Sequence, residues 1–100
     1  MKAVWRGTVV AEAPNDEIIE MEGVLFFPPS GVHREFLVPS ETPYTCPWRG
    51  VCTYYSLMVE TEEGRDAAWS YEHPKEGSIE RVGKDFTGYV AYGNDVVVGE

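Results

Sequence analysis

The segment TCPWRGVCTYY, residues 45–55, places a thiol, an indole and a guanidinium within four positions and then adds a second thiol and two phenols. Residues of these types could form a reactive site, half of a metal site, a disulfide or part of a core. Cys46 precedes a proline, which disfavours a helical backbone, so we expect it in a loop beside Arg49. A nearby cation favours the thiolate, and Cys46 is therefore a candidate catalytic nucleophile. The alternative is a half-buried loop cysteine packed against Trp48.

The two cysteines are expected to be reduced and free of metal. Cys52 opens a predicted strand, where a buried free cysteine usually serves as a small apolar core residue. A bridge between the two thiols is the alternative. A structural zinc site needs about four Cys or His ligands, commonly in pairs two to four residues apart. The whole inventory is Cys46, Cys52, His33 and His73, and five residues separate the thiols. The sequence therefore predicts no metal and no cofactor.

Acid–base chemistry has one further candidate, the run His33-Arg34-Glu35. In an extended segment His33 and Glu35 would point to one side and Arg34 to the other. Glu35 is thus a second candidate catalytic residue, and Arg34 a candidate ligand anchor. The alternative is a solvated polar face. The chain has no glycine-rich phosphate loop, nucleophile elbow or paired metal-binding carboxylate motif.

The aromatic residues exceed what a small core needs, and some of them could line a pocket. Small-ligand sites combine apolar and aromatic walls with a few polar anchors, here Arg34 or Arg49. Aromatic side chains also pack cores, which is the alternative for each of them. The candidate wall residues are Trp48, Tyr54, Trp69 and Tyr71.

Length and charge limit the classes of protein to which the chain can belong. One hundred residues suit a single domain with one core, residues 1–100. The net charge of −9, with eight basic residues scattered along the sequence, argues against nucleic acid and anionic membrane surfaces as partners.

No apolar run approaches the ~18 residues needed to cross a bilayer, and no export signal is visible. We expect a cytoplasmic protein whose thiols stay reduced; its oligomeric state is left open.

Glycine and proline interrupt the chain at short intervals, which suits short strands better than helices. The pattern predicts an all-β, mainly antiparallel domain of about seven or eight short strands. It allows at most one or two short helical turns, near residues 32–35 and 78–81. The expected strands are residues 4–11, 17–21, 24–27, 36–38, 51–60, 67–71, 86–92 and 95–98.

Three hairpins are expected between these strands. In YVAYGNDVVV, Gly93-Asn94 lies between two runs of β-formers and can supply the positive φ angles of a tight turn. The other two turns are expected at Glu22-Gly23 and near residues 62–64. Along residues 51–59 the odd positions share one face, which is expected to be buried, whereas the even positions form a semi-polar face.

Four segments, in their order and spacing, resemble the bacterial family catalogued as domain of unknown function 427. They are LFFPPSGVHREFLVPS (residues 25–40), TCPWRG (45–50), the following YYS (54–56) and DAAWSYEHP (66–74). The resemblance implies a small all-β domain similar to the β-tent folds, which include methionine sulfoxide reductase B and the thalidomide-binding domain of cereblon.

The resemblance also implies which positions matter. Residues 46–50 fill the family motif Cys-Pro-aromatic-basic-Gly, Arg34 and Glu35 fill a charged pair, and Trp69 and Tyr71 lie in the last motif. The β-tent relatives typically carry zinc on two cysteine pairs, which this chain lacks, so their chemistry does not transfer with the fold.

Two functions follow as hypotheses. The first is a small-molecule site beside the TCPWRG segment, walled by aromatic side chains and anchored by Arg34 and Arg49, with catalysis by Cys46 or Glu35 as a further possibility. The second is a protein–protein interaction module that uses an exposed aromatic patch. The first hypothesis predicts one concavity surrounded by Arg34, Glu35, Cys46, Trp48, Arg49 and Trp69.

Overall fold

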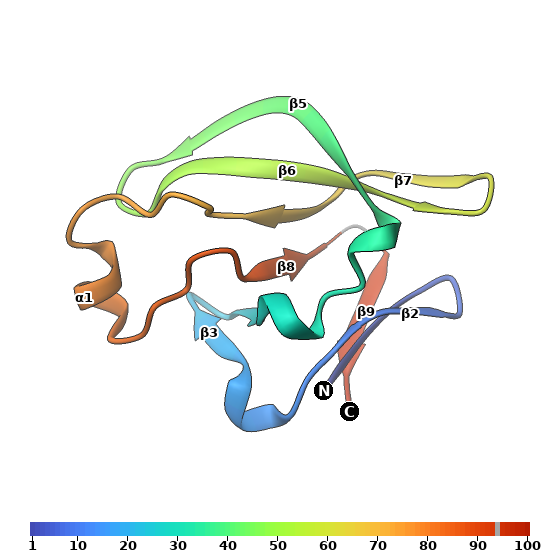
Figure 1. Ribbon diagram of the computed structural model, residues 1–100, viewed down its shortest axis with the longest axis horizontal. Coiled ribbons are helices and arrows are strands. Elements are labelled where there is room, and N and C mark those ends of the chain that lie inside the picture. Colours follow the sequence, from blue (N-terminus) through green and yellow to red (C-terminus); the bar gives the residue numbers. More distant parts are fainter. Residues whose placement is uncertain (94) are drawn as a thin grey trace.

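The computed structural model describes residues 1–93 and 95–100 and arranges them in two sheets (Figure 1). The strand order is β2-β1-β9 in the smaller sheet and β3-β4-β8-β7-β6-β5 in the larger one, and all pairs are antiparallel. The prediction of an all-β, mainly antiparallel domain is confirmed. The strands are β1 Lys2–Trp5, β2 Thr8–Glu12, β3 Ile19–Met21, β4 Val24–Phe27, β5 Leu37–Cys46, β6 Gly50–Val59, β7 Glu62–Ser70, β8 Val90–Tyr92 and β9 Val96–Gly99.

Helical structure is short everywhere in the described residues. The only α-helix among them, α1, spans Ser78–Val82, where a helical turn was predicted. The 3-10 turns η1, η2 and η3 span Asn15–Glu17, Pro29–Gly31 and Arg34–Phe36. The last of these, η3, overlaps the helical turn predicted near residues 32–35. None of the helices in the described part of the chain is long and apolar enough to cross a membrane.

The predicted strand 4–11 is in fact a hairpin. Arg6 and Gly7 both have positive φ, 49° and 83°, and they form a two-residue turn between the paired residues Trp5 and Thr8. Positive φ at both central residues is the geometry that matches the twist of a two-residue hairpin. This turn accounts for one strand more than the sequence pattern indicated.

Strand β5 is much longer than the predicted segment 36–38, although it contains Pro39 and Pro43. It lies at the outer edge of the larger sheet, where one side of the strand needs no backbone donors, so proline is tolerated there. The pairing with β6 shifts between these two prolines, which marks a bulge.

Two of the three predicted hairpins are present. The β3–β4 turn lies at Glu22 and Gly23, with φ of 52° and 81°, as expected. The β6–β7 hairpin turns at residues 60–61 and not at 62–64, because Val59 already pairs with Glu62. Gly64 is a strand residue, and a Cβ there would lie 3.0 Å from the Trp5 ring, so this glycine makes room for packing.

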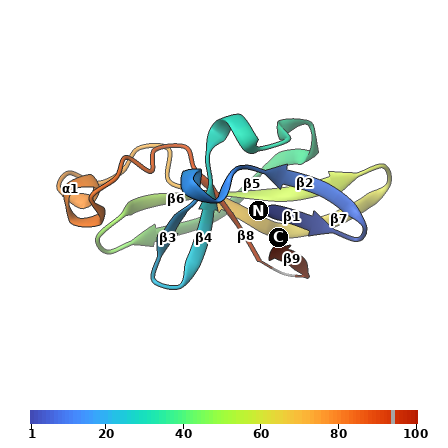
Figure 2. The same ribbon diagram turned by 90° about the horizontal axis from the view of Figure 1, so that it is seen from below.

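The third hairpin, predicted at Gly93-Asn94, is wrong, and Asn94 itself lies outside the described residues. Strand β8 is paired on both sides, with β4 and with β7, whereas β9 pairs with β1 in the other sheet. Because both edges of β8 are occupied, the following strand has no edge to join. The chain ends therefore meet through β1 and β9, and the two termini lie side by side in Figures 1 and 2.

Each face of the larger sheet carries a buried apolar cluster. On one face Tyr55 and Leu57 of β6 pack in a cluster with Trp5 and Val10 of the smaller sheet. On the other face Cys52 belongs to a second cluster, and Tyr54 packs against it. The even-numbered side chains of β6 are therefore largely covered, and the predicted semi-polar face is wrong. The odd-numbered face is not buried throughout, because Val51 is 62% exposed. The second cluster, built of Ile19, Met21, Phe26, Cys46, Cys52, Tyr71, Phe86 and Ala91, extends toward α1, which lies at one end of the molecule (Figure 2).

Candidate functional site

The TCPWRG segment forms the turn between β5 and β6. Cys46 pairs with Gly50, which leaves Pro47, Trp48 and Arg49 as the connection. Cys46 is the last residue of β5 and is 3% exposed, as part of the second cluster. The expectation that Cys46 lies in a loop is wrong, because strand pairing continues up to this residue and its side chain joins the second buried cluster.

Gly50 allows another segment to lie directly against this turn. Its φ is 107°, and a Cβ at this position would lie 3.0 Å from the backbone nitrogen of Lys75. That nitrogen donates a hydrogen bond to the Arg49 carbonyl oxygen at 2.8 Å. The Lys75 ammonium donates to the Pro47 carbonyl oxygen at 3.1 Å. The segment that leads into α1 is thereby fixed to the turn.

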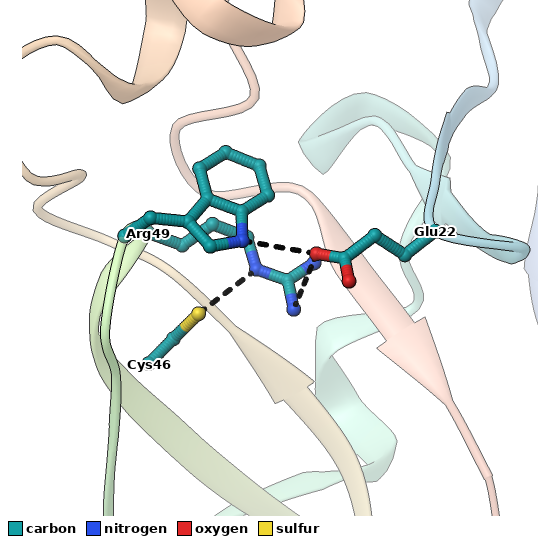
Figure 3. Close-up of polar contacts among 4 residues, drawn as sticks. Glu22, Cys46 and Arg49 are labelled. Atoms are coloured by element: carbon teal, nitrogen blue, oxygen red, sulfur yellow. Dashed lines mark hydrogen bonds and ion pairs between the residues drawn. The ribbon is translucent and has the colours of Figure 1, made fainter.

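Arg49 is the central side chain of the site (Figure 3). Its side chain is only 15% exposed. Its guanidinium carbon lies 5.0 Å from the centre of the Trp48 ring and 5.1 Å from that of Tyr71, within the range of cation–π attraction. Its Nε donates a hydrogen bond to the Cys46 sulfur at 3.4 Å. Three separate contacts thus hold the cation in place above the thiol.

The pKa values of the two thiols are shifted in opposite directions. Burial alone would raise the pKa of Cys46, but hydrogen bonds from the Arg49 side chain and from the backbone of Arg49 and Trp48, together with the charge of Arg49, outweigh it and lower the pKa below 9.0. Burial raises the pKa of Cys52 to about 11, and a hydrogen bond with Tyr71 offsets only part of that rise. Cys46 is the thiol that ionises more readily.

Glu22, from the β3–β4 turn, reaches into the site. Its Oε1 accepts a hydrogen bond from the Trp48 indole Nε1 at 3.0 Å and lies 3.5 Å from Nη2 of Arg49 (Figure 3). The carboxylate side chain is 61% exposed, in contrast to the covered guanidinium. Residues 26 positions apart in the sequence are joined here through one oxygen atom.

Trp48 separates two open hollows in the surface. The guanidinium carbon of Arg81, from α1, lies 4.4 Å from the centre of the Trp48 ring, on the border of both. The hollows measure about 340 Å³ and about 220 Å³. The larger is lined by Glu20, Met21, Glu22, Trp48, Arg81 and Val82, and the smaller by Pro47, Trp48, Lys75, Glu76, Gly77, Ser78 and Arg81.

Three of the chain's eight basic residues gather around this one turn. Arg49 and Arg81 stack on Trp48, and Lys75 binds the carbonyl oxygen of Pro47. In sequence these residues are scattered, which hid the cluster. The folded structure thereby gathers three cations at one turn, beside the carboxylates of Glu20, Glu22 and Glu76, which line the same hollows.

Of the other predicted wall residues, Tyr54, Trp69 and Tyr71 lie on the same face of the sheet as Cys46. The rings of Tyr54 and Trp69 are 6.2 Å apart. Tyr71 is only 2% exposed, and burial raises the pKa of its hydroxyl despite the nearby charge of Arg49. Tyr71 therefore supports Arg49 from below and does not reach the surface.

The structure does not bring Arg34 and Glu35 to this site. Both lie in η3 and are exposed. Arg34 acts electrostatically on Tyr55 and Tyr92, which belong to the cluster between the two sheets, on the opposite face of the larger sheet from Cys46. The prediction that these two residues surround one concavity with Cys46 and Arg49 is wrong, because β6 and its neighbours stand between them.

Sequence reasoning missed Glu22, Lys75 and Arg81 as members of the site. Arg81 falls in a predicted helical turn and Glu22 in a predicted hairpin turn, but nothing in their spacing relates them to Trp48. These residues are brought together when two distant segments, the β3–β4 turn and the segment with α1, pack on the β5–β6 turn.

Within the described part of the chain, no group of three or more His, Cys, Asp or Glu side chains could hold a metal ion. The sulfur of Cys46, the thiol with the lowered pKa, contacts the guanidinium of Arg49, and a guanidinium does not bind a metal ion.

The family model described as "Domain of unknown function (DUF427)" matches residues 1–98. No curated protein matches the chain.

Proposed function

Because the chain belongs to the DUF427 family, whose description names no activity, we propose a function from the geometry of the site: it binds a small anionic molecule beside Trp48. The ligand lies in the hollows between the β5–β6 turn, the β3–β4 turn and α1. Arg49 and Arg81 attract its charge, and the Trp48 ring contacts its apolar part. A cytoplasmic location, where both thiols stay reduced, belongs to the same proposal.

The observation that carries the proposal is the stacking of two guanidinium groups on one half-buried indole. Arg49 and Arg81 lie 5.0 and 4.4 Å from the Trp48 ring, and both are cations at any physiological pH. Packing alone does not require two like charges at one ring in a protein of otherwise acidic composition. An anion placed between them would offset their repulsion.

The surroundings also suit a small ligand. The hollow of about 340 Å³ is within the usual range for small-molecule sites, and it combines apolar walls, Met21 and Val82, with charged groups. Arg49 is already fixed by Cys46 and Tyr71, so little side-chain freedom would be lost on binding.

Cys46 is the group at this site that could carry covalent chemistry. Its lowered pKa favours the thiolate, and its sulfur touches the same guanidinium that would anchor the ligand. Reaction would require Arg49 or the ligand to uncover the sulfur, since Cys46 is 3% exposed. Glu35, the other candidate, lies away from this site and has no place in the proposal.

An aromatic docking patch has less support. The large apolar side chains exposed in the described residues are Val38, Tyr44, Val51 and Val97, and Tyr44 is the only aromatic among them. Tyr44 pairs with Cys52 and Val51 with Thr45, which places these two side chains on opposite faces of the sheet. This distribution favours a ligand site over a flat docking surface.

The test is to measure the melting temperature with a panel of small organic acids, phosphates and their neutral analogues. A ligand at 100 times its Kd stabilises a protein by about 2.7 kcal/mol, which a thermal scan resolves easily. We expect an anion to stabilise the wild-type protein and to lose this effect in Arg49→Gln and Arg81→Gln. Lys84→Gln, which removes an exposed charge outside both hollows, is the control and should retain it.

The proposal fails if no anion of the panel stabilises the protein. It fails equally if Arg49→Gln, Arg81→Gln and Lys84→Gln respond alike. Mass spectrometry of the protein purified from cell extract, under conditions that keep complexes intact, would identify a bound molecule directly.

A further inference from the structure

The position of Glu22 indicates what kind of anion the site takes. Its carboxylate oxygen accepts from the Trp48 indole at 3.0 Å and lies 3.5 Å from the Arg49 guanidinium. An indole N–H and a guanidinium can only donate hydrogen bonds, so this pair requires an acceptor. The protein itself shows that a carboxylate oxygen fits between them.

Glu22 is held there weakly. Its side chain is 61% exposed and stands on a two-residue turn, and exposed ion pairs contribute only ~0–1 kcal/mol. Arg49 would keep its position without Glu22, because Tyr71 and Cys46 hold it independently. The donor pair is thus fixed in advance, whereas its present acceptor can leave at little cost.

We propose, on the basis of the ligand site described above, that the ligand carries a carboxylate and that Glu22 occupies the place of this carboxylate in the empty protein. Ligand binding displaces Glu22 toward solvent. Glu22 is therefore a built-in competitor that sets the affinity of the site.

A carboxylate fits this position better than a phosphate does. Glu20 and Glu22 both line the hollow of about 340 Å³, and their charge opposes a doubly charged group more strongly than a singly charged one. The planar carboxylate also matches the planar guanidinium, and it needs no more donors than Trp48 and Arg49 supply.

The same guanidinium contacts the Cys46 sulfur at 3.4 Å, so a bound carboxylate brings its neighbouring carbon toward the thiol. Iodoacetate is a probe that uses this proximity. The Cys46 thiolate attacks the CH₂ carbon, the C–S bond forms, the C–I bond breaks, and iodide leaves with the bonding electrons. Iodoacetamide undergoes the same substitution but lacks the carboxylate.

The experiment compares the alkylation rates of Cys46 by the two reagents, followed by peptide mass mapping. We expect Glu22→Gln to raise the iodoacetate rate relative to the iodoacetamide rate by up to about fivefold, the factor that an exposed ion pair contributes. Glu20→Gln is the matched control, because it removes the same charge from the same hollow. It should change the ratio by much less. Acetate should slow the iodoacetate reaction in Glu22→Gln more than acetamide does.

Equal effects of Glu22→Gln and Glu20→Gln would overturn the displacement, since charge alone would then explain both. Protection by inorganic phosphate in place of acetate would overturn the carboxylate class. Either result leaves the ligand site itself intact, provided that Arg49→Gln still abolishes anion binding. If Arg49→Gln changes neither anion binding nor the reagent ratio, the ligand site fails as well.

Discussion

The two cysteines of this chain have nearly the same exposure, 3% and 4%, yet they differ in chemistry. The difference comes from Arg49, which donates its Nε–H to Cys46 at 3.4 Å. Desolvation acts against the thiolate at both positions, but only at Cys46 does a charged donor outweigh it. One side chain three residues away in sequence therefore decides which thiol ionises more readily.

The first prediction concerns the pH dependence of alkylation. In Cys52→Ala, which isolates Cys46, the rate with iodoacetamide should reach half its maximum below pH 9.0. In Cys46→Ala the remaining Cys52 should require a pH of about 11. Adding Arg49→Gln to Cys52→Ala should move the Cys46 midpoint upward, because burial remains while the donor is lost. Identical midpoints for the two thiols would contradict this account.

The same shifts have opposite effects on stability. Because folding lowers the pKa of Cys46, its contribution to the free energy of unfolding is present above the unfolded value of 9.0 and is lost as the pH falls through the folded value. For Cys52 folding raises the pKa, so its contribution is present below pH 9.0 and is lost as the pH rises toward about 11.

At the scale of elements, the site depends on how closely the segment before α1 approaches the β5–β6 turn. The Arg49 carbonyl oxygen accepts from the backbone of Lys75 at 2.8 Å, and a Cβ at Gly50 would stand 3.0 Å from that nitrogen. Gly50 thus serves two needs, a positive φ and the absence of a side chain. A longer residue would push α1, and Arg81 with it, away from Trp48.

The second prediction is that Gly50→Ala destabilises the protein more than Gly83→Ala does. Both glycines have positive φ, 107° and 86°, so each substitution costs about 1–3 kcal/mol of backbone strain. At Gly83 nothing lies within 4 Å of the added Cβ, whereas at Gly50 the backbone of Lys75 must move. Urea unfolding gives the difference, and Trp48 fluorescence should also change in Gly50→Ala. Equal losses of stability in the two variants would show that the close approach of Lys75 to Gly50 does not contribute to the free energy of unfolding.

At the scale of the molecule, the larger sheet separates the apolar cluster between the two sheets from the face that carries the proposed ligand site. Between the sheets lies an apolar cluster in which Trp5 is 1% exposed and Phe27 and Leu57 are fully buried. The other face carries the second cluster and, at its edge, the half-buried Trp48 with its cations. Substitutions in the cluster between the sheets should therefore affect stability, whereas substitutions at the edge around Trp48 should mainly affect ligand binding.

The third prediction tests this division with two tryptophans. Trp5→Ala should cost about 3–5 kcal/mol in the free energy of unfolding, because it leaves a cavity between the sheets. Trp48→Ala should cost no more than about 2 kcal/mol, since its ring is partly exposed, but it should abolish anion binding. Denaturant titration and thermal scans with ligand measure both effects. If Trp48→Ala unfolds the protein as readily as Trp5→Ala, the ring is a core residue and the division is wrong.

The sequence by itself determined the fold class of this protein and the turn at Glu22-Gly23, because these depend on local chemistry. The turn at Glu22-Gly23 follows from residues that tolerate positive φ, and the short apolar runs between breakers follow from side-chain periodicity. It also identified Cys46, Trp48 and Arg49, which are neighbours in sequence and remain neighbours in space. Here the local information was sufficient.

Only the tertiary structure decided the partners of strands and the membership of the site. The segment 90–98 has the pattern of a hairpin, but β8 was already paired on both edges, so β9 joined β1 in the other sheet. Arg34 resembles a ligand anchor in sequence, yet it lies across the sheet from Arg49, whereas Glu22 and Arg81 were brought to Trp48 by packing. The physical reason is that such contacts depend on which edges and faces are still free when distant segments meet, and no local pattern records that.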